Sequence, residues 1–84
     1  MKRNELDLFL TFRWFDLIDS GVKTVEYRRK PYWTSRVNDW IFRNSNPVVV
    51  FHRGYTNNII RFRVKKVIDN FWKTDLMIIL GEKL

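Results

Sequence analysis

Apolar and polar residues alternate along much of the chain, which is the period-two pattern of strands with one buried face. The alternation starts at Leu6 and is sharpest from Ile59 to Ile68. Shorter apolar runs bounded by turn residues have the β-branched and aromatic content of strands. Together these patterns predict six strands, which cover residues 6–10, 23–29, 40–43, 48–53, 59–68 and 75–80.

One helix is expected between the first two strands. Thr11 can cap its first turn, and Gly21 can end it in a left-handed conformation. Trp14, Leu17 and Ile18 then lie on one side. A helix of about two turns is not stable alone, so it must pack on the sheet. Residues 32–37 are expected to form a loop or a single helical turn, and Gly81 is expected to end the last strand.

These elements favour an α+β domain that is mainly β. The chain has 84 residues, which corresponds to one domain over residues 1–84, and 4 Trp, 7 Phe and 3 Tyr supply bulk for its core. Because closure protects strand edges, we expect a small mixed barrel of about six strands with one short helix after the first strand. Trp14 and Trp40 are expected in the core, and Trp72 at one end of it.

The composition excludes several classes of site. There is no cysteine, which excludes disulfides, cysteine nucleophiles and thiolate metal sites. His52 is the only histidine, so we expect no metal and interpret it as a structural residue or a ligand contact. No glycine-rich phosphate loop is present, and no cofactor is expected. Without an apolar signal region or a spanning run, the chain is expected to be cytoplasmic, with no membrane contact.

The charge balance favours a polyanionic partner. Sixteen Lys and Arg against nine Asp and Glu leave a formal charge of +7. Basic side chains two apart on a strand can follow the phosphates of an extended nucleic acid. The candidate backbone contacts are Arg61, Arg63 and Lys65, extended by Arg53 and Arg36, and the candidate stacking rings are Tyr32, Trp33 and Tyr55. The alternative is a charged surface that only prevents aggregation of strands.

The predicted strand at 23–29 carries a row of polar side chains. Its candidate ligand-binding residues are Lys23, Thr24, Glu26 and Arg28. Thr24, Glu26 and Arg28 are expected to project from one face about 6–7 Å apart, with Lys23 at the start of the strand, while Val25 and Tyr27 point the other way. Glu26 can accept a hydrogen bond from an amine or amide, and Arg28 can donate to a carbonyl or phosphate. The alternative is a solvated ion pair worth less than about 1 kcal/mol.

The segment from Ile18 to Arg28 resembles the signature of ASCH domains, with a helix that ends in glycine, then Lys-Thr, one residue, Glu, one residue and Arg. More general matches follow in the family's order. The segment Val37 to Phe42 is similar to its Gly-Asp-x-Ile-x-Phe strand entry, with Asn38 in place of Gly. The segments 61–68 and 79–81 are similar to its later strands.

This resemblance implies a PUA-like β-barrel with a cleft beside the helix, lined by the Lys-Thr-x-Glu-x-Arg strand. It also implies binding of RNA or a nucleotide-like ligand, in connection with translation or RNA modification. Some ASCH proteins are acetylcytidine amidohydrolases with a Thr three residues after the Lys, whereas Glu26 occupies that position here. We therefore expect a binding module without catalytic residues. A nucleoside-processing amidohydrolase that uses Lys23 or Glu26, or a protein-interaction module for an acidic partner, are the alternatives.

Overall fold

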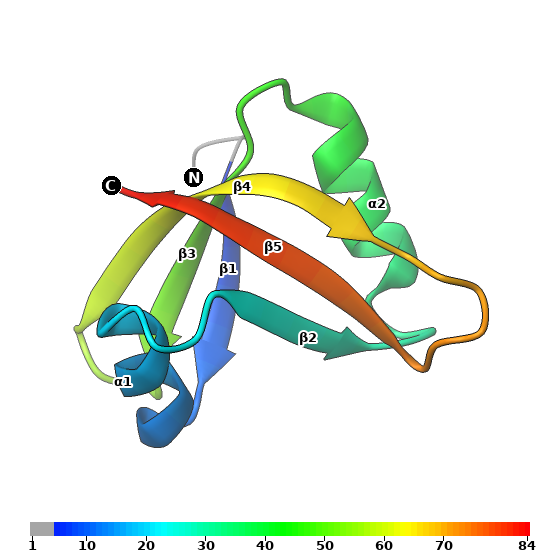
Figure 1. Ribbon diagram of the computed structural model, residues 1–84. Coiled ribbons are helices and arrows are strands. Elements are labelled where there is room, and N and C mark those ends of the chain that lie inside the picture. The colour runs from blue at the N-terminus through cyan, green and yellow to red at the C-terminus, as the bar shows by residue number, and fades with distance from the viewer. Residues whose placement is uncertain (1–4) are drawn as a thin grey trace.

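Five strands form one sheet that curls into a half-barrel, with two helices packed on it (Figure 1). The computed structural model describes residues 5–84. In chain order the elements are β1 (Glu5–Leu10), α1 (Phe12–Asp19), β2 (Val25–Arg29), α2 (Thr34–Arg43), β3 (Val48–Arg53), β4 (Ile59–Ile68) and β5 (Asp75–Lys83). The expected α+β, mainly β class is confirmed.

The strand order is β1-β3-β4-β5-β2, in which β1 runs parallel to β3 and the other neighbours are antiparallel. β1 and β2 are therefore the two edges of the sheet, and within residues 5–84 no strand pairing joins them. The prediction of a barrel of about six strands is wrong in strand number, and the barrel remains half open. This opening is where both cavities described below lie.

The inner face of the curled sheet holds the core, as the alternation predicts for β1 and β4. The buried residues of these two strands are Leu6, Leu8, Leu10, Phe62 and Val64. On the outer face of β4, Arg63 and Lys65 are exposed. In β3 the whole run from Val48 to Phe51 is buried. Val49 and Phe51 belong to the core cluster, and Val48 and Val50 alternate with them on the other face. The hydrophobic pattern thus assigns the faces of these strands correctly.

α1 starts and ends where the sequence predicts, but it turns a different face to the core. The backbone N–H of Trp14 donates to the Thr11 hydroxyl at 3.4 Å, and Gly21 has a φ of 84° after the last turn. Phe15 and Ile18 are buried, whereas Trp14 is 48% exposed, so its expected core position is wrong. Aromatic residues at positions 12, 14 and 15 allow two apolar faces, and the sheet selects the face of Phe15.

The second helix replaces an expected strand. Residues 40–43 were expected to be a strand and 32–37 a loop, but both belong largely to the ten-residue helix α2. Val37 and Trp40 are buried and Phe42 is 90% exposed. Apolar positions at 33, 37, 40 and 41 follow helical spacing, which outweighs the local strand preference of Trp40 and its neighbours. The segment that resembles the ASCH strand entry is therefore helical, and there are two helices rather than one.

The end of the chain departs from two further expectations. β5 continues through Gly81 to Lys83 instead of ending at the glycine. A Cβ at Gly81 would lie 3.2 Å from the backbone oxygen of Arg63, so glycine allows close approach where β4 bulges. Trp72 is 67% exposed in the turn before β5 and does not close the core.

Candidate functional site

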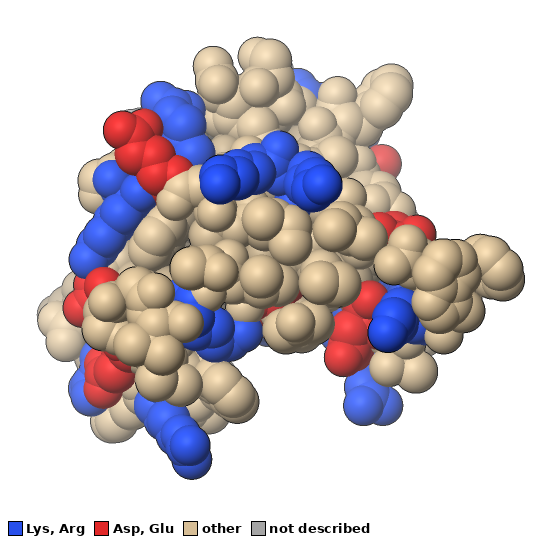
Figure 2. All heavy atoms as spheres, in the orientation of Figure 1, with Lys and Arg blue, Asp and Glu red and all other residues tan. Residues whose placement is uncertain are grey.

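A cavity of about 490 Å³ opens where the end of β1 and the start of α1 face β2. Three walls contribute: the end of β1, the first turn of α1, and β2 with the residue that leads into it. The lining residues are Phe9, Leu10, Thr11, Trp14, Lys23, Glu26, Tyr27 and Arg28. In Figure 2 the lower margin of the molecule is indented beneath β2 and beside α1. The open seam of the half-barrel therefore has a pocket at its α1 end.

The polar row of β2 faces the interior of the half-barrel. The strand register pairs Glu26 with Ile78 and Arg28 with Leu76, and both partners on β5 are fully buried. Glu26 itself is only 6% exposed. The carboxylate is therefore not part of a solvated surface pair, and that interpretation of the row is wrong.

Arg28 holds the carboxylate and also spans the opening. Its Nε donates to Glu26 Oε2 at 3.0 Å, and its second terminal nitrogen donates to the backbone oxygen of Phe9 at 3.2 Å. Phe9 lies on β1, so one guanidinium connects the two unpaired edges of the sheet. This contact joins the two edges at one point, and the bond from Nε orients the carboxylate of Glu26.

Lys23 completes the charged cluster under two aromatic rings. Its Nζ lies 5.3 Å from the Trp14 ring centroid and 4.9 Å from that of Tyr27, and it donates to the backbone oxygen of Val25. The same nitrogen is 3.9 Å from Glu26 Oε1. The carboxylate of Glu26 therefore lies between two cations, Arg28 and Lys23.

Burial sets the proton affinities of this cluster. It raises the pKa of the Glu26 carboxyl above its ordinary value of 4.5, although the charges of Arg28 and Lys23 lower it in part. Burial also lowers the pKa of the Lys23 ammonium below 10.5, against the charge of Glu26. In both groups, burial disfavours the charged form. The attraction between the opposite charges therefore offsets only part of the hydration that the two groups lose.

Thr24 does not join the other three residues. It precedes β2, it is exposed, and its backbone oxygen accepts from the N–H of Leu80 at 3.0 Å. Its role is therefore to extend the pairing of β2 with β5. The structure brings together Lys23, Glu26 and Arg28, and it adds aromatic walls that the sequence did not single out: Phe9, Trp14 and Tyr27.

The basic residues expected to follow phosphates are partly neutralised by carboxylates. Arg53 makes a two-point contact with Asp16 at 3.0 and 3.1 Å. Arg61 lies 3.1 Å from Glu5, and Arg63 lies 3.9 Å from Glu82. In Figure 2 the Lys and Arg side chains on the face shown are separated by neutral and acidic surface. Among the expected contacts, Lys65 and Arg36 make no ion pair with any residue from 5 to 84, and Arg36 lies apart from the others, on α2.

His52 lies on the outer face of the sheet, away from the charged cluster. Its Nε2 is 2.8 Å from Asp7 Oδ1, and its ring stacks on Phe9 at 4.4 Å. Among residues 5–84, no three His, Asp or Glu side chains are close enough together to hold a metal ion. Over the same part of the chain, no helix has the length and apolar character needed to cross a bilayer.

We expect Glu26→Gln to become more stable relative to the wild type as pH rises from about 4 to 7. A carboxyl whose pKa is raised on folding binds protons more tightly in the folded state. Wild-type stability is therefore highest below the unfolded pKa and falls as pH rises through the folded pKa. Urea unfolding of both proteins across this range measures the difference, since the other titrating groups cancel.

Asp16→Asn provides a control of opposite sign. The hydrogen bond from Arg53 lowers the pKa of Asp16 below 3.8, so its contribution is present at neutral pH and is lost in acid. Relative to this variant, the wild type should lose stability as pH falls below about 4. If the Glu26→Gln difference follows the same direction as Asp16→Asn, the burial of Glu26 is described wrongly.

The arrangement can recognise a small polar ring. It offers one carboxylate acceptor, guanidinium and ammonium donors, and aromatic faces for stacking. The volume lies within the range of about 300–1,000 Å³ that is usual for small-molecule sites. Compared with known proteins, the chain matches no protein-family model and no curated protein sequence.

Proposed function

We propose that this protein is an RNA- or nucleotide-binding module of the ASCH, PUA-like type that holds one base or nucleotide-like group in the β1–β2 cavity. The observation that carries the proposal is the inward-facing Glu26–Arg28 pair in an open, aromatic-walled pocket. The resemblance of residues 18–28 to the ASCH signature supports it, because Lys23, Glu26 and Arg28 all come from that segment.

The chemistry of the pocket suits a nucleobase. Oε1 of Glu26 can accept from an exocyclic amine or a ring N–H, and the remaining guanidinium donors of Arg28 can meet a carbonyl or phosphate oxygen. The ring of Trp14 or Tyr27 can stack on the base for about 1–3 kcal/mol. The net charge of +7 attracts the polyanion from a distance.

A contribution to stability does not by itself explain why these charged side chains are buried. Replacing a buried ion pair with apolar residues of similar size is often neutral or stabilising, by about 1–4 kcal/mol. A domain of this length is only marginally stable, because it buries a smaller fraction of its surface on folding than a larger domain does. Ligand recognition explains why charged groups occupy the inner face of β2, where Ile78 and Leu76 are their neighbours.

Glu26→Gln is expected to change which nucleotide the protein prefers. We expect at least about a tenfold loss for ligands that donate an amine to the carboxylate, because a neutral amide replaces the charged acceptor and presents an NH₂ donor beside it. Calorimetric titration with the four ribonucleoside monophosphates and short single-stranded RNA measures this. Glu82→Gln, which removes an exposed carboxylate, should leave the preference unchanged. Failure of every nucleotide to bind, or unaltered preference in Glu26→Gln, would rule out the proposal.

The environment of Lys23 favours one second candidate, an amidohydrolase acting on acylated nucleosides. Burial under Trp14 and Tyr27 lowers the pKa of the Lys23 ammonium, as nucleophilic or basic lysines require. Turnover of an acylated nucleoside that is abolished by Lys23→Met would establish it. Binding without turnover supports the recognition module.

A further inference from the structure

We propose that a second cavity, between β1 and α2, binds the phosphate-bearing continuation of a single-stranded polynucleotide whose one base occupies the β1–β2 cavity. This inference rests on the proposed function and extends it from one nucleotide to a path along the seam of the half-barrel. It also moves the phosphate contacts from β4 to α2.

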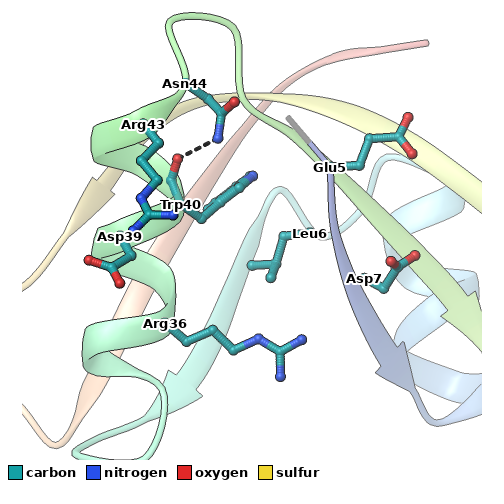
Figure 3. A pocket seen from close by; sticks show the side chains of 8 residues that line it. All are labelled: Glu5, Leu6, Asp7, Arg36, Asp39, Trp40, Arg43 and Asn44. Atoms are coloured by element: carbon teal, nitrogen blue, oxygen red, sulfur yellow. Dashed lines mark hydrogen bonds between the residues drawn. The ribbon is translucent and has the colours of Figure 1, made fainter. Parts of the chain in front are cut away.

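The second cavity has an apolar floor, and its α2 wall carries Arg36 and Arg43 with the carboxylate of Asp39 between them in the sequence. Its volume is about 810 Å³, and its lining residues are Glu5, Leu6, Asp7, Arg36, Asp39, Trp40, Arg43 and Asn44. In Figure 3, Leu6 points from β1 toward α2, and the side chain of Arg36 extends from α2 toward β1. The carboxylates of Glu5 and Asp7 point away from the helix, toward their partners Arg61 and His52.

The two cavities adjoin along one strand. Glu5, Leu6 and Asp7 line the second cavity, and Phe9 and Leu10 line the first. Leu6 and Phe9 are about 10 Å apart along an extended strand, which is within reach of neighbouring units of one polynucleotide. β1 is an edge strand, so its unpaired edge borders the open seam, and the fully buried Leu8 lies between the residues that line the two cavities.

A single ring connects the cationic groups of the two cavities. The guanidinium of Arg28, in the first cavity, and that of Arg36, in the second, each lie 5.2 Å from the centroid of the Trp33 ring. Arg43 follows Arg36 by seven residues, which is about two helical turns and places it on the same face of α2. The guanidinium groups thus form a series that starts beside Glu26 and runs along α2.

The two arginines of α2, Arg36 and Arg43, form no ion pair within residues 5–84, whereas Arg61 and Arg63 on β4 both lie near carboxylates. On β4, Lys65 also forms no ion pair in this range. An exposed strand edge can also accept an extended peptide. The unpaired arginines and the net charge of +7 favour the polynucleotide, which carries a charge on every unit.

The test is a length series of single-stranded RNA, from mononucleotide to octanucleotide, titrated into the wild type and two double variants at several salt concentrations. For Arg36→Gln/Arg43→Gln we expect about a tenfold loss of octanucleotide affinity and a salt slope that is shallower by about 1.4, because two phosphate contacts are lost. Mononucleotide affinity should not change. Arg63→Gln/Lys65→Gln makes the same charge change on β4 and should have a smaller effect on both.

Each outcome decides between the two proposals. Equal losses from both double variants, or no gain in affinity with RNA length while the mononucleotide still binds, would overturn the α2 path and leave the β1–β2 site intact. An acidic peptide of matched charge that competes as well as RNA would assign the groove to a protein partner. Failure of both mononucleotide and octanucleotide to bind would overturn both proposals.

Discussion

Arg28→Ala is expected to lower the free energy of unfolding by about 3 kcal/mol at neutral pH, because removing one partner leaves a buried charge uncompensated. Glu26 would lose its closest contact, at 2.9–3.0 Å. The guanidinium bridge to the backbone oxygen of Phe9 would also be lost, so the two edges of the sheet would no longer be tied at this point. Urea unfolding measures the loss.

Two variants separate this effect from a general loss of charge. Arg29→Ala removes the neighbouring exposed arginine on β2 and should change stability by less than about 0.5 kcal/mol. Glu26→Gln in the Arg28→Ala background should recover much of the stability, since no uncompensated carboxylate then remains. The penalty of Arg28→Ala should also shrink as pH falls through the raised pKa of Glu26. Additive effects of the two substitutions would show that the residues do not form a functional pair.

Trp40→Ala is expected to cost about 3–4 kcal/mol, in the range for large aromatic residues removed from a core. Trp40 is 7% exposed, and together with Val37 it anchors α2 to the sheet. A ten-residue helix is marginal in water without such packing. Amide hydrogen exchange should therefore show loss of protection concentrated in α2, and octanucleotide affinity should fall as in Arg36→Gln/Arg43→Gln.

Phe42→Ala is the matched control for this prediction. It removes an aromatic ring from the same helix, but this ring is 90% exposed. Its effect on unfolding should stay within about 0.5 kcal/mol, and protection in α2 should persist. If the two alanine variants are equally destabilised, the face that α2 presents to the core has been assigned wrongly.

Strand positions could be predicted where a single buried face imposes period two. The bounds expected for β3 and β4 agree with the structure, and the alternation of Leu6, Leu8 and Leu10 identifies the inner face of β1. Capping chemistry located α1 through Thr11 and Gly21. These signals are local, and tertiary packing does not alter them.

Residues that depend on how elements pack could not be placed in this way. Trp40 and its neighbours have strand propensity, and only the wider spacing that includes Val37 reveals α2. Because that helix was not predicted, Arg43 was not recognised as lying on one face with Arg36. Trp14 was expected in the core because its hydrophobicity says nothing about which side of α1 meets the sheet.

The most direct test of the central claim is to follow the side-chain N–H resonances of Arg28 Nε and the Trp14 indole by NMR during titration with ribonucleoside monophosphates. We predict that both shift and saturate together, while the indole of Trp72, in the exposed turn before β5, does not. Shifts confined to Trp72 or to Arg61 and Arg63 on β4, with Arg28 and Trp14 unaffected, would contradict the account.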